Sequence, residues 1–156
     1  MHTFRELVAG LGAGLAIPDM EADEDGYVAL DVDGYIIHLQ DDAGAGAIVL
    51  YAVLQEIEDA RLLEVCARLL TANAFWRETG GATLALDEAS GHVLLCRAVP
   101  LVGLDLAALE TALGNFADAA AHWSRWLDVV NDGGPLYEGE GGMAVHEFAS
   151  FGEGLA

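Results

Sequence analysis

The first apolar pattern in the chain repeats at helical spacing. Five apolar side chains near the amino terminus recur at three- and four-residue intervals, so they would share one face of a helix. They are Phe4, Leu7, Val8, Leu11 and Leu15. Glycines at positions 10, 12 and 14 are poor helix formers, and we expect this helix to be weak and to end near them.

The pattern then changes to the alternation that is typical of half-buried β-strands. Inward positions of two successive strands are Val28, Leu30 and Val32, then Tyr35, Ile37 and Leu39. Asp33–Gly34 between them is a dipeptide that favours a two-residue type I′ hairpin turn. After an expected loop at 41–46, residues 48–54 are rich in branched and aromatic side chains and predict a third strand. Together these segments predict an antiparallel meander.

A second helix is predicted over residues 59–75. Glu58 and Asp59 place negative charge where the helix dipole favours it. Positions at helical spacing follow: Leu62, Val65, Cys66, Leu69 and Asn73. Gly80–Gly81 can supply a left-handed helix end, and a hairpin follows in which Leu84 and Leu86 pair, through a loop at 87–91, with a strand at 92–98.

The last regular element is a helix that begins after Asp105, a good N-cap. Its apolar stripe is Leu106, Leu109, Leu113, Phe116, Ala120, Trp123, Leu127 and Val130. Residues 131–156 are rich in glycine and acidic side chains, so we expect a mobile tail with at most a short strand or turn near 143–148. The order α-β-β-β-α-β-β-α predicts an α+β sandwich, with one domain at 1–130.

Charge and length narrow the classes of partner. Twenty-six acidic residues oppose six basic ones, which gives a net charge of −20. Such a charge repels nucleic acid and anionic membrane surfaces, so we expect neither as a partner. No apolar run approaches the roughly 20 residues that span a bilayer, and the first residues lack the pattern of an export signal. We therefore expect a cytoplasmic protein without membrane insertion.

The residue patterns that carry common chemistries are incomplete. Cys66 and Cys96 lack CxxC spacing, so we expect buried free thiols. Residues 21–26 fit the start of an EF-hand calcium loop, but Val32 stands where the closing glutamate belongs. The glycines of 10–14 do not complete a dinucleotide-binding motif, and the five histidines have no paired metal-ligand spacing. We predict no catalytic residue, no metal and no cofactor, although an enzyme whose site is assembled from distant residues stays possible.

Apolar side chains fall on both faces of the predicted sheet. Ile36 and Leu94 point away from the faces used by their neighbours Ile37 and Leu95. An apolar outer face calls for a protein partner, unless helices cover both faces.

Several short motifs occur in an order that resembles one family. They are Asp33–Gly34, Asn73-Ala74-Phe75, Gly81-x-x-Leu84, Pro100–Leu101 and Leu109-x-x-x-Leu113-x-x-Phe116. In this order the chain, over about residues 3–130, resembles the class I type III secretion chaperones, the Tir-chaperone or CesT-like family. The glycine-rich tail has no counterpart in the pattern.

The resemblance implies a non-enzymatic, acidic homodimer of the bacterial cytoplasm. Such proteins bind the N-terminal region of a secreted effector in extended form and keep it competent for export. Client-binding positions implied by the family architecture are Phe4, Leu7, Leu11, Val28, Leu30, Ile37 and Leu50. Implied dimer-interface positions are Leu62, Cys66, Leu69, Trp76, Leu84 and Leu94. A dimeric cytosolic regulatory protein-binding module of the same fold is the alternative.

Overall fold

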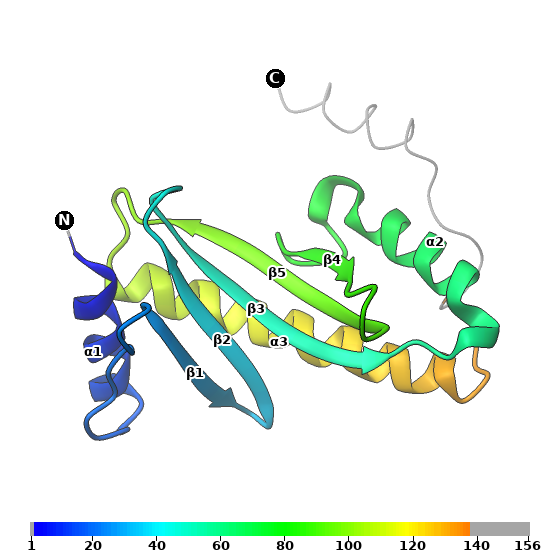
Figure 1. Ribbon diagram of the computed structural model, residues 1–156, viewed down its shortest axis with the longest axis horizontal. Helices are drawn as coiled ribbons and strands as arrows, with labels where there is room; N and C mark the ends of the chain where they lie inside the picture. Colours follow the sequence, from blue (N-terminus) through cyan, green and yellow to red (C-terminus); the bar gives the residue numbers. More distant parts are fainter. Residues whose placement is uncertain (1, 138–156) are drawn as a thin grey trace.

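The computed structural model describes residues 2–137 (Figure 1). Its elements, in chain order, are α1 Phe4–Gly14, β1 Tyr27–Val32, β2 Tyr35–Asp42, β3 Ala47–Glu56, a 3₁₀ turn Asp59–Arg61, α2 Leu62–Asn73, a second 3₁₀ turn Ala74–Trp76, β4 Thr83–Leu86, β5 His92–Pro100 and α3 Leu106–Asn131. The predicted order of helices and strands and the α+β class are confirmed.

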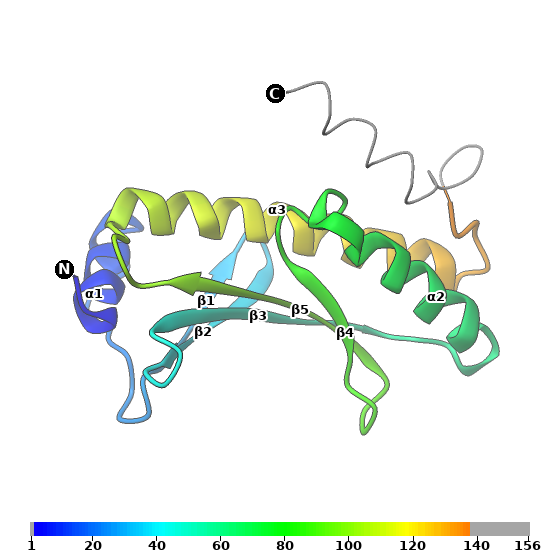
Figure 2. The same ribbon diagram turned by 90° about the horizontal axis from the view of Figure 1, so that it is seen from above.

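The five strands form one antiparallel sheet in the order β1-β2-β3-β5-β4. Strands β1 and β4 are its edges. All three helices lie on one side of the sheet, with α3 running along it (Figure 2). Within residues 2–137 no helix covers the opposite side, so the arrangement with helices on both faces is not the one adopted.

The first helix is fixed at its start by a capping box. The Thr3 hydroxyl accepts from the backbone N–H of Glu6, and the Glu6 carboxylate accepts from the backbone N–H of Thr3. One of the three glycines of this helix, Gly12, is required by packing. A Cβ at Gly12 would lie 2.6 Å from Cβ of Met20, because the loop after α1 folds closely against the helix.

The core lies between α3 and the inner face of the sheet. Asp105 is the N-cap of α3, as predicted, and its side chain accepts from the Ala108 N–H at 2.8 Å. Phe116 and Trp123 are its largest fully buried side chains, and they pack with the inward residues of the central strands. The helical and alternating patterns therefore identified the buried faces correctly.

The second helix is shorter than predicted. The sequence pattern indicated one helix over 59–75, but a 3₁₀ turn precedes Leu62 and α2 ends at Asn73. The Asn73 amide group bonds to the backbone of Leu84, and Phe75 and Trp76 then adopt φ of 59° and 53°. A left-handed backbone cannot continue a right-handed helix, so the chain turns toward β4.

The strands extend further than the alternation suggested. The loop between β2 and β3 is confined to 43–46, and the Asp42 carboxylate accepts from the Ala45 N–H within it. The hairpin turn between β1 and β2 is as predicted, with positive φ at both Asp33 and Gly34.

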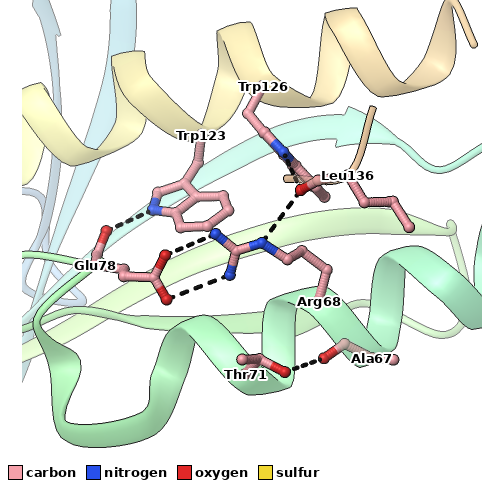
Figure 3. Close-up of polar contacts among 7 residues, drawn as sticks. All are labelled: Ala67, Arg68, Thr71, Glu78, Trp123, Trp126 and Leu136. Atoms are coloured by element: carbon pink, nitrogen blue, oxygen red, sulfur yellow. Dashed lines mark hydrogen bonds and ion pairs between the residues drawn. The ribbon is translucent and has the colours of Figure 1, made fainter. Parts of the chain in front are cut away.

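The described chain continues beyond the predicted end of the domain. The Leu136 carbonyl oxygen accepts from Trp126 Nε1 at 3.1 Å and from Arg68 Nε at 3.3 Å (Figure 3). The Arg68 guanidinium also forms an ion pair with Glu78 and lies 4.8 Å from the ring centroid of Tyr137. Residues 132–137 are thereby held against α2 and α3, and the strand or turn expected near 143–148 lies outside the described residues.

Candidate protein-binding surfaces

The side of the sheet without helices is largely apolar, and we call it the open sheet face. Its members alternate with the buried residues of each strand. They include Tyr27 and Ala29 of β1, Ile36 and His38 of β2, Val49, Tyr51 and Val53 of β3, and Leu94, Cys96 and Ala98 of β5. Ile36 and Val53 are 48% and 54% exposed. Side chains of this kind on an uncovered face are typical of a protein-binding surface.

Three aromatic rings cross this face in a row. His38 lies between Tyr27 and Tyr51, with its ring centroid 4.5 Å from that of Tyr51 and the two planes 10° apart. The Tyr27 hydroxyl and Nδ1 of His38 share a hydrogen bond of 2.7 Å. Burial lowers the pKa of His38, and burial together with the nearby Tyr27 raises the pKa of Tyr51. Both shifts favour the uncharged forms of the His38 and Tyr51 side chains.

A second apolar surface lies on α2. Val65, Leu69 and Ala72 face the core, which leaves Leu63 and Leu70 on the outside, 84% and 71% exposed. Leu62, Phe75 and Trp76 are exposed beside them on the same helix and the turn that follows. We call Leu62, Leu63, Leu70, Phe75 and Trp76 the α2 surface. An exposed pair of leucines seven residues apart lies on one side of a helix and suits packing against another helix.

The turn after α2 holds Trp76 at the β4 edge. The Trp76 carbonyl oxygen accepts from the Gly81 N–H at 3.1 Å, and its Nε1 donates to the Thr83 hydroxyl at 3.2 Å. Left-handed backbone at non-glycine residues costs about 1–3 kcal/mol each. These bonds offset that cost and fix where the indole is presented.

The residues predicted to bind client lie mostly inside the molecule. Six of the seven are buried in one hydrophobic cluster: Phe4, Leu7, Leu11, Leu30, Ile37 and Leu50. Val28 is half-buried against that cluster. The structure brings the seven together in that cluster, on the inner side of the sheet beneath α1 and α3. Their contact with a client stays a prediction.

The residues predicted at the dimer interface are divided between two sides of the sheet. Leu62 and Trp76 are exposed on the α2 surface, and Cys66 of α2 is half-buried. Leu69 and Leu84 are buried in the core. Leu94 is half-buried on the open sheet face, because its neighbour Leu95 points toward the helices. The six positions therefore do not form one continuous surface.

The remaining polar features organise loops. The Asp23 carboxylate accepts from the N–H groups of Asp25 and Tyr27, which makes a local turn in the acidic segment. Within residues 2–137, no three His, Cys, Asp or Glu side chains converge as metal ligands. Both cysteines are unpaired and half-buried, less covered than predicted. No helix of the described part is long and apolar enough to cross a membrane.

A hollow of about 300 Å³ lies on the outer side of α3. It is lined by His122, Arg125, Trp126, Val129 and Pro135. The two polar side chains are both basic and exposed, so the hollow does not pair an acid with a base or a nucleophile.

The fold agrees with the comparisons to known proteins. The sequence pattern of the Tir chaperone protein (CesT) family matches residues 6–124. The chain belongs to this family. The resemblance deduced from the short motifs is thus confirmed, and the family is one of chaperones. No curated protein matches the chain.

Several solved structures of similar fold are protein complexes. A chain of the ExsC–ExsE complex is 23% identical, with a TM-score of 0.68 over 79% of this chain and 92% of its own length. A chain of the structure of the Yersinia pestis type III secretion chaperone SycH, in complex with a stable fragment of YscM2, is 21% identical. Its TM-score is 0.60, over 77% of this chain and 98% of its own length. A chain of the ExoT–SpcS complex of Pseudomonas aeruginosa is 25% identical, with a TM-score of 0.58 over 78% of this chain and 98% of its own length.

Two features of these surfaces escaped the sequence analysis. The first is the pair Leu63 and Leu70, whose seven-residue spacing beside the core-facing positions of α2 could have been found in the sequence. The Tyr27–His38 pair follows in part from the two-residue turn at 33–34, which fixes the register of β1 against β2. The position of Tyr51 in the same row depends on the pairing of β2 with β3 and has no local signal.

Proposed function

We propose that this protein is a non-enzymatic export chaperone of the bacterial cytoplasm. It binds the N-terminal region of a type III secretion effector in extended form and keeps that region competent for secretion. The observation that carries the proposal is the family match over residues 6–124. Support comes from structures of similar fold that contain a chaperone with a bound protein, such as SycH with the YscM2 fragment.

The open sheet face and the β1 edge suit an extended client. An extended segment can pair its backbone with an edge strand, which requires no particular client sequence. Exposed apolar side chains such as Ile36 and Val53 then select apolar residues of the client. Because the α2 surface lies beside the other edge, at β4, client binding and self-association use different parts of the molecule.

The seven predicted client positions take a supporting role in this proposal. Val28 is the accessible member. The six buried residues pack α1 and α3 against the sheet and so hold the client-binding strands in shape. A charge at any of these six would act first on folding, not on client affinity.

The homodimer forms, in this proposal, through the α2 surface. A twofold axis would bring Leu63 and Leu70 of one copy against the same residues of the other, as an isologous interface requires. Leu62 and Trp76, from the predicted interface set, lie within that contact. Burial of these leucines would remove the largest exposed apolar side chains of the helix from water.

Co-expression with a candidate effector tests the proposal. The chain is produced with a full-length effector and with the same effector lacking its N-terminal region, and the mass of each purified complex is measured by light scattering. We expect two chaperone chains to form a complex with the full-length effector, and no complex to form with the truncated effector. Limited proteolysis should then leave a protected N-terminal effector fragment.

Two matched variants assign the surface. Val53→Asp, on the open sheet face, should reduce effector capture at least tenfold. Val102→Asp, at an exposed valine in the turn before α3, should leave capture unchanged. Equal capture of the truncated effector, or turnover of a substrate by the purified protein, would refute the export role.

A further inference from the structure

The aromatic row on the open sheet face ends abruptly. The strand register aligns His38 with Tyr51, Tyr51 with Cys96, and Cys96 with Thr83, so one line of residues crosses from β2 to the β4 edge. Along this line the side chains change from two large rings to a small thiol and a small hydroxyl. On the Cys96 side of Tyr51 the side chains therefore extend less far from the sheet than the Tyr51 ring does.

The orientation of the rings shows which surface of Tyr51 is left. Its centroid lies 4.5 Å from that of His38, close to the spacing of about 4.8 Å between neighbouring strands, and the planes are nearly parallel. The two rings thus stand face to face across β2 and β3. One face of Tyr51 is covered by His38, and the other points toward β5, where the residue aligned with it is Cys96.

A step in the surface lies beyond that second face. Cys96 is half-buried and forms its floor, while Thr83 is exposed at the far side and accepts a hydrogen bond from Trp76 Nε1. Two strand spacings, about 10 Å, separate the backbone of Tyr51 from that of Thr83. Cys96 and Thr83, the two residues aligned beyond Tyr51, are small, so no ring stands on that line on the β5 side of Tyr51.

The electrostatics of this step favour a cation. No outward position of the five described strands is an arginine or lysine, and Arg97 of β5 points to the helix side, where it donates to the Gly80 carbonyl oxygen. Tyr51 offers the electron-rich face of a phenol ring, and Asp31 of β1 is exposed on the same face of the sheet. A net charge of −20 adds a general attraction for basic segments.

We propose that Tyr51 and Cys96 form an anchor for one arginine of the bound extended segment, whose guanidinium stacks on the Tyr51 ring above the thiol. Arginine suits this step better than lysine because its planar group can lie parallel to the ring while its nitrogens still donate hydrogen bonds. The inference rests on the proposed function, since it names a chemical feature of the client. It selects clients that place an arginine between apolar residues.

Peptides of defined sequence test the anchor. The probe is a capped seven-residue peptide that alternates serine and leucine and carries one arginine at its centre. Partner peptides replace the arginine with citrulline, which has the same shape without the charge, or with lysine. Titrations up to millimolar concentration are followed by NMR of the Tyr51 and His38 ring protons. We expect the arginine peptide to bind about fivefold more tightly than the citrulline peptide and to shift both rings.

Three variants localise the preference. Tyr51→Leu should remove it, and Cys96→Leu, which keeps the ring but fills the step, should remove it without loss of the aromatic stack. Tyr35→Leu, at a tyrosine outside the row, should retain it. Thermal melts establish that each variant is folded. Equal affinity for arginine and citrulline, no ring shift with any peptide, or a preference that survives Cys96→Leu would overturn the anchor.

The outcomes separate the anchor from the export role. Arginine preference without capture of any effector would keep the anchor and reject the export role. Capture of effector by a protein with no arginine preference would do the reverse.

Discussion

The side chain of Asn73 pairs with the backbone of Leu84 as a neighbouring strand would. Its Nδ2 donates to the Leu84 carbonyl oxygen at 2.8 Å, and its Oδ1 accepts from the Leu84 N–H at 2.8 Å. This pair joins the end of α2 to the edge strand β4, at the point where the chain turns through Phe75 and Trp76. It therefore couples the α2 surface to the sheet.

Replacement of Asn73 by aspartate should destabilise the protein. The change removes the donor to Leu84 and places a negative charge against its carbonyl oxygen, so we expect a loss of about 1–3 kcal/mol in the free energy of unfolding. Urea denaturation measures it. Asn115→Asp, at an exposed position of α3, is the control and should change stability by less than about 0.5 kcal/mol. Equal stability of the two variants would show that the Leu84 pair contributes nothing.

Adjacent leucines of α2 should respond to a charge in opposite ways. Leu70→Asp is expected to leave the fold intact and convert a dimer to a monomer, because Leu70 is exposed on the α2 surface. Leu69→Asp should unfold or aggregate the chain, since Leu69 is buried and loss of a buried leucine alone costs about 2–5 kcal/mol. Circular dichroism and light scattering distinguish these results. A folded dimer of the Leu70 variant would exclude this interface.

The ion pair of Arg68 should contribute more to the free energy of unfolding than the ion pair of Arg61. Arg68 is nearly covered, with its guanidinium 2.6 Å from the Glu78 carboxylate and 5.4 Å from the ring centroid of Trp123. Glu78→Gln should lower the free energy of unfolding by about 1–2 kcal/mol. Glu64→Gln, which weakens the more exposed pair with Arg61, should cost about 0–0.5 kcal/mol. Urea midpoints for the two variants test this order.

Stability should decrease in mild acid through His38. Burial lowers its pKa below the ordinary value of 6.5, so the unfolded chain binds the proton more readily than the folded chain. The neutral ring contributes stability that is present above pH 6.5 and is lost as the pH falls below that value. Melting temperatures between pH 7.5 and 5.0 for the wild type and for His38→Gln measure the effect. The difference between the two proteins should change over this range, and a constant difference would contradict the prediction.

Much of the fold followed from local patterns. Helical and alternating spacing identified the faces that α3, β1 and β2 bury, because 3.6- and two-residue periods follow directly from backbone geometry. The N-cap Asp105 and the turn at Asp33–Gly34 could be predicted for the same reason, since each depends on atoms only a few residues away. Family membership was also readable, from short motifs in a fixed order.

The candidate surfaces were only partly readable. Spacing showed that Leu30 and Ile37 are apolar and share a face, but an apolar residue serves equally well in a core or in a binding groove. Packing buried both residues when α1 and α3 covered that face. The placement of all helices on one side of the sheet likewise made Ile36 and Val53 outward residues without cover.

The sequence alone determined the elements, the acidic charge and the family, because these depend on composition and on neighbours along the chain. Tertiary structure decided where α2 ends, which apolar residues stay outside and that Tyr51 stands beside Cys96. Each of those outcomes joins segments far apart in the sequence: Asn73 with β4, the helices with one face, and β3 with β5. Such contacts form only when the whole chain packs, so no local pattern encodes them.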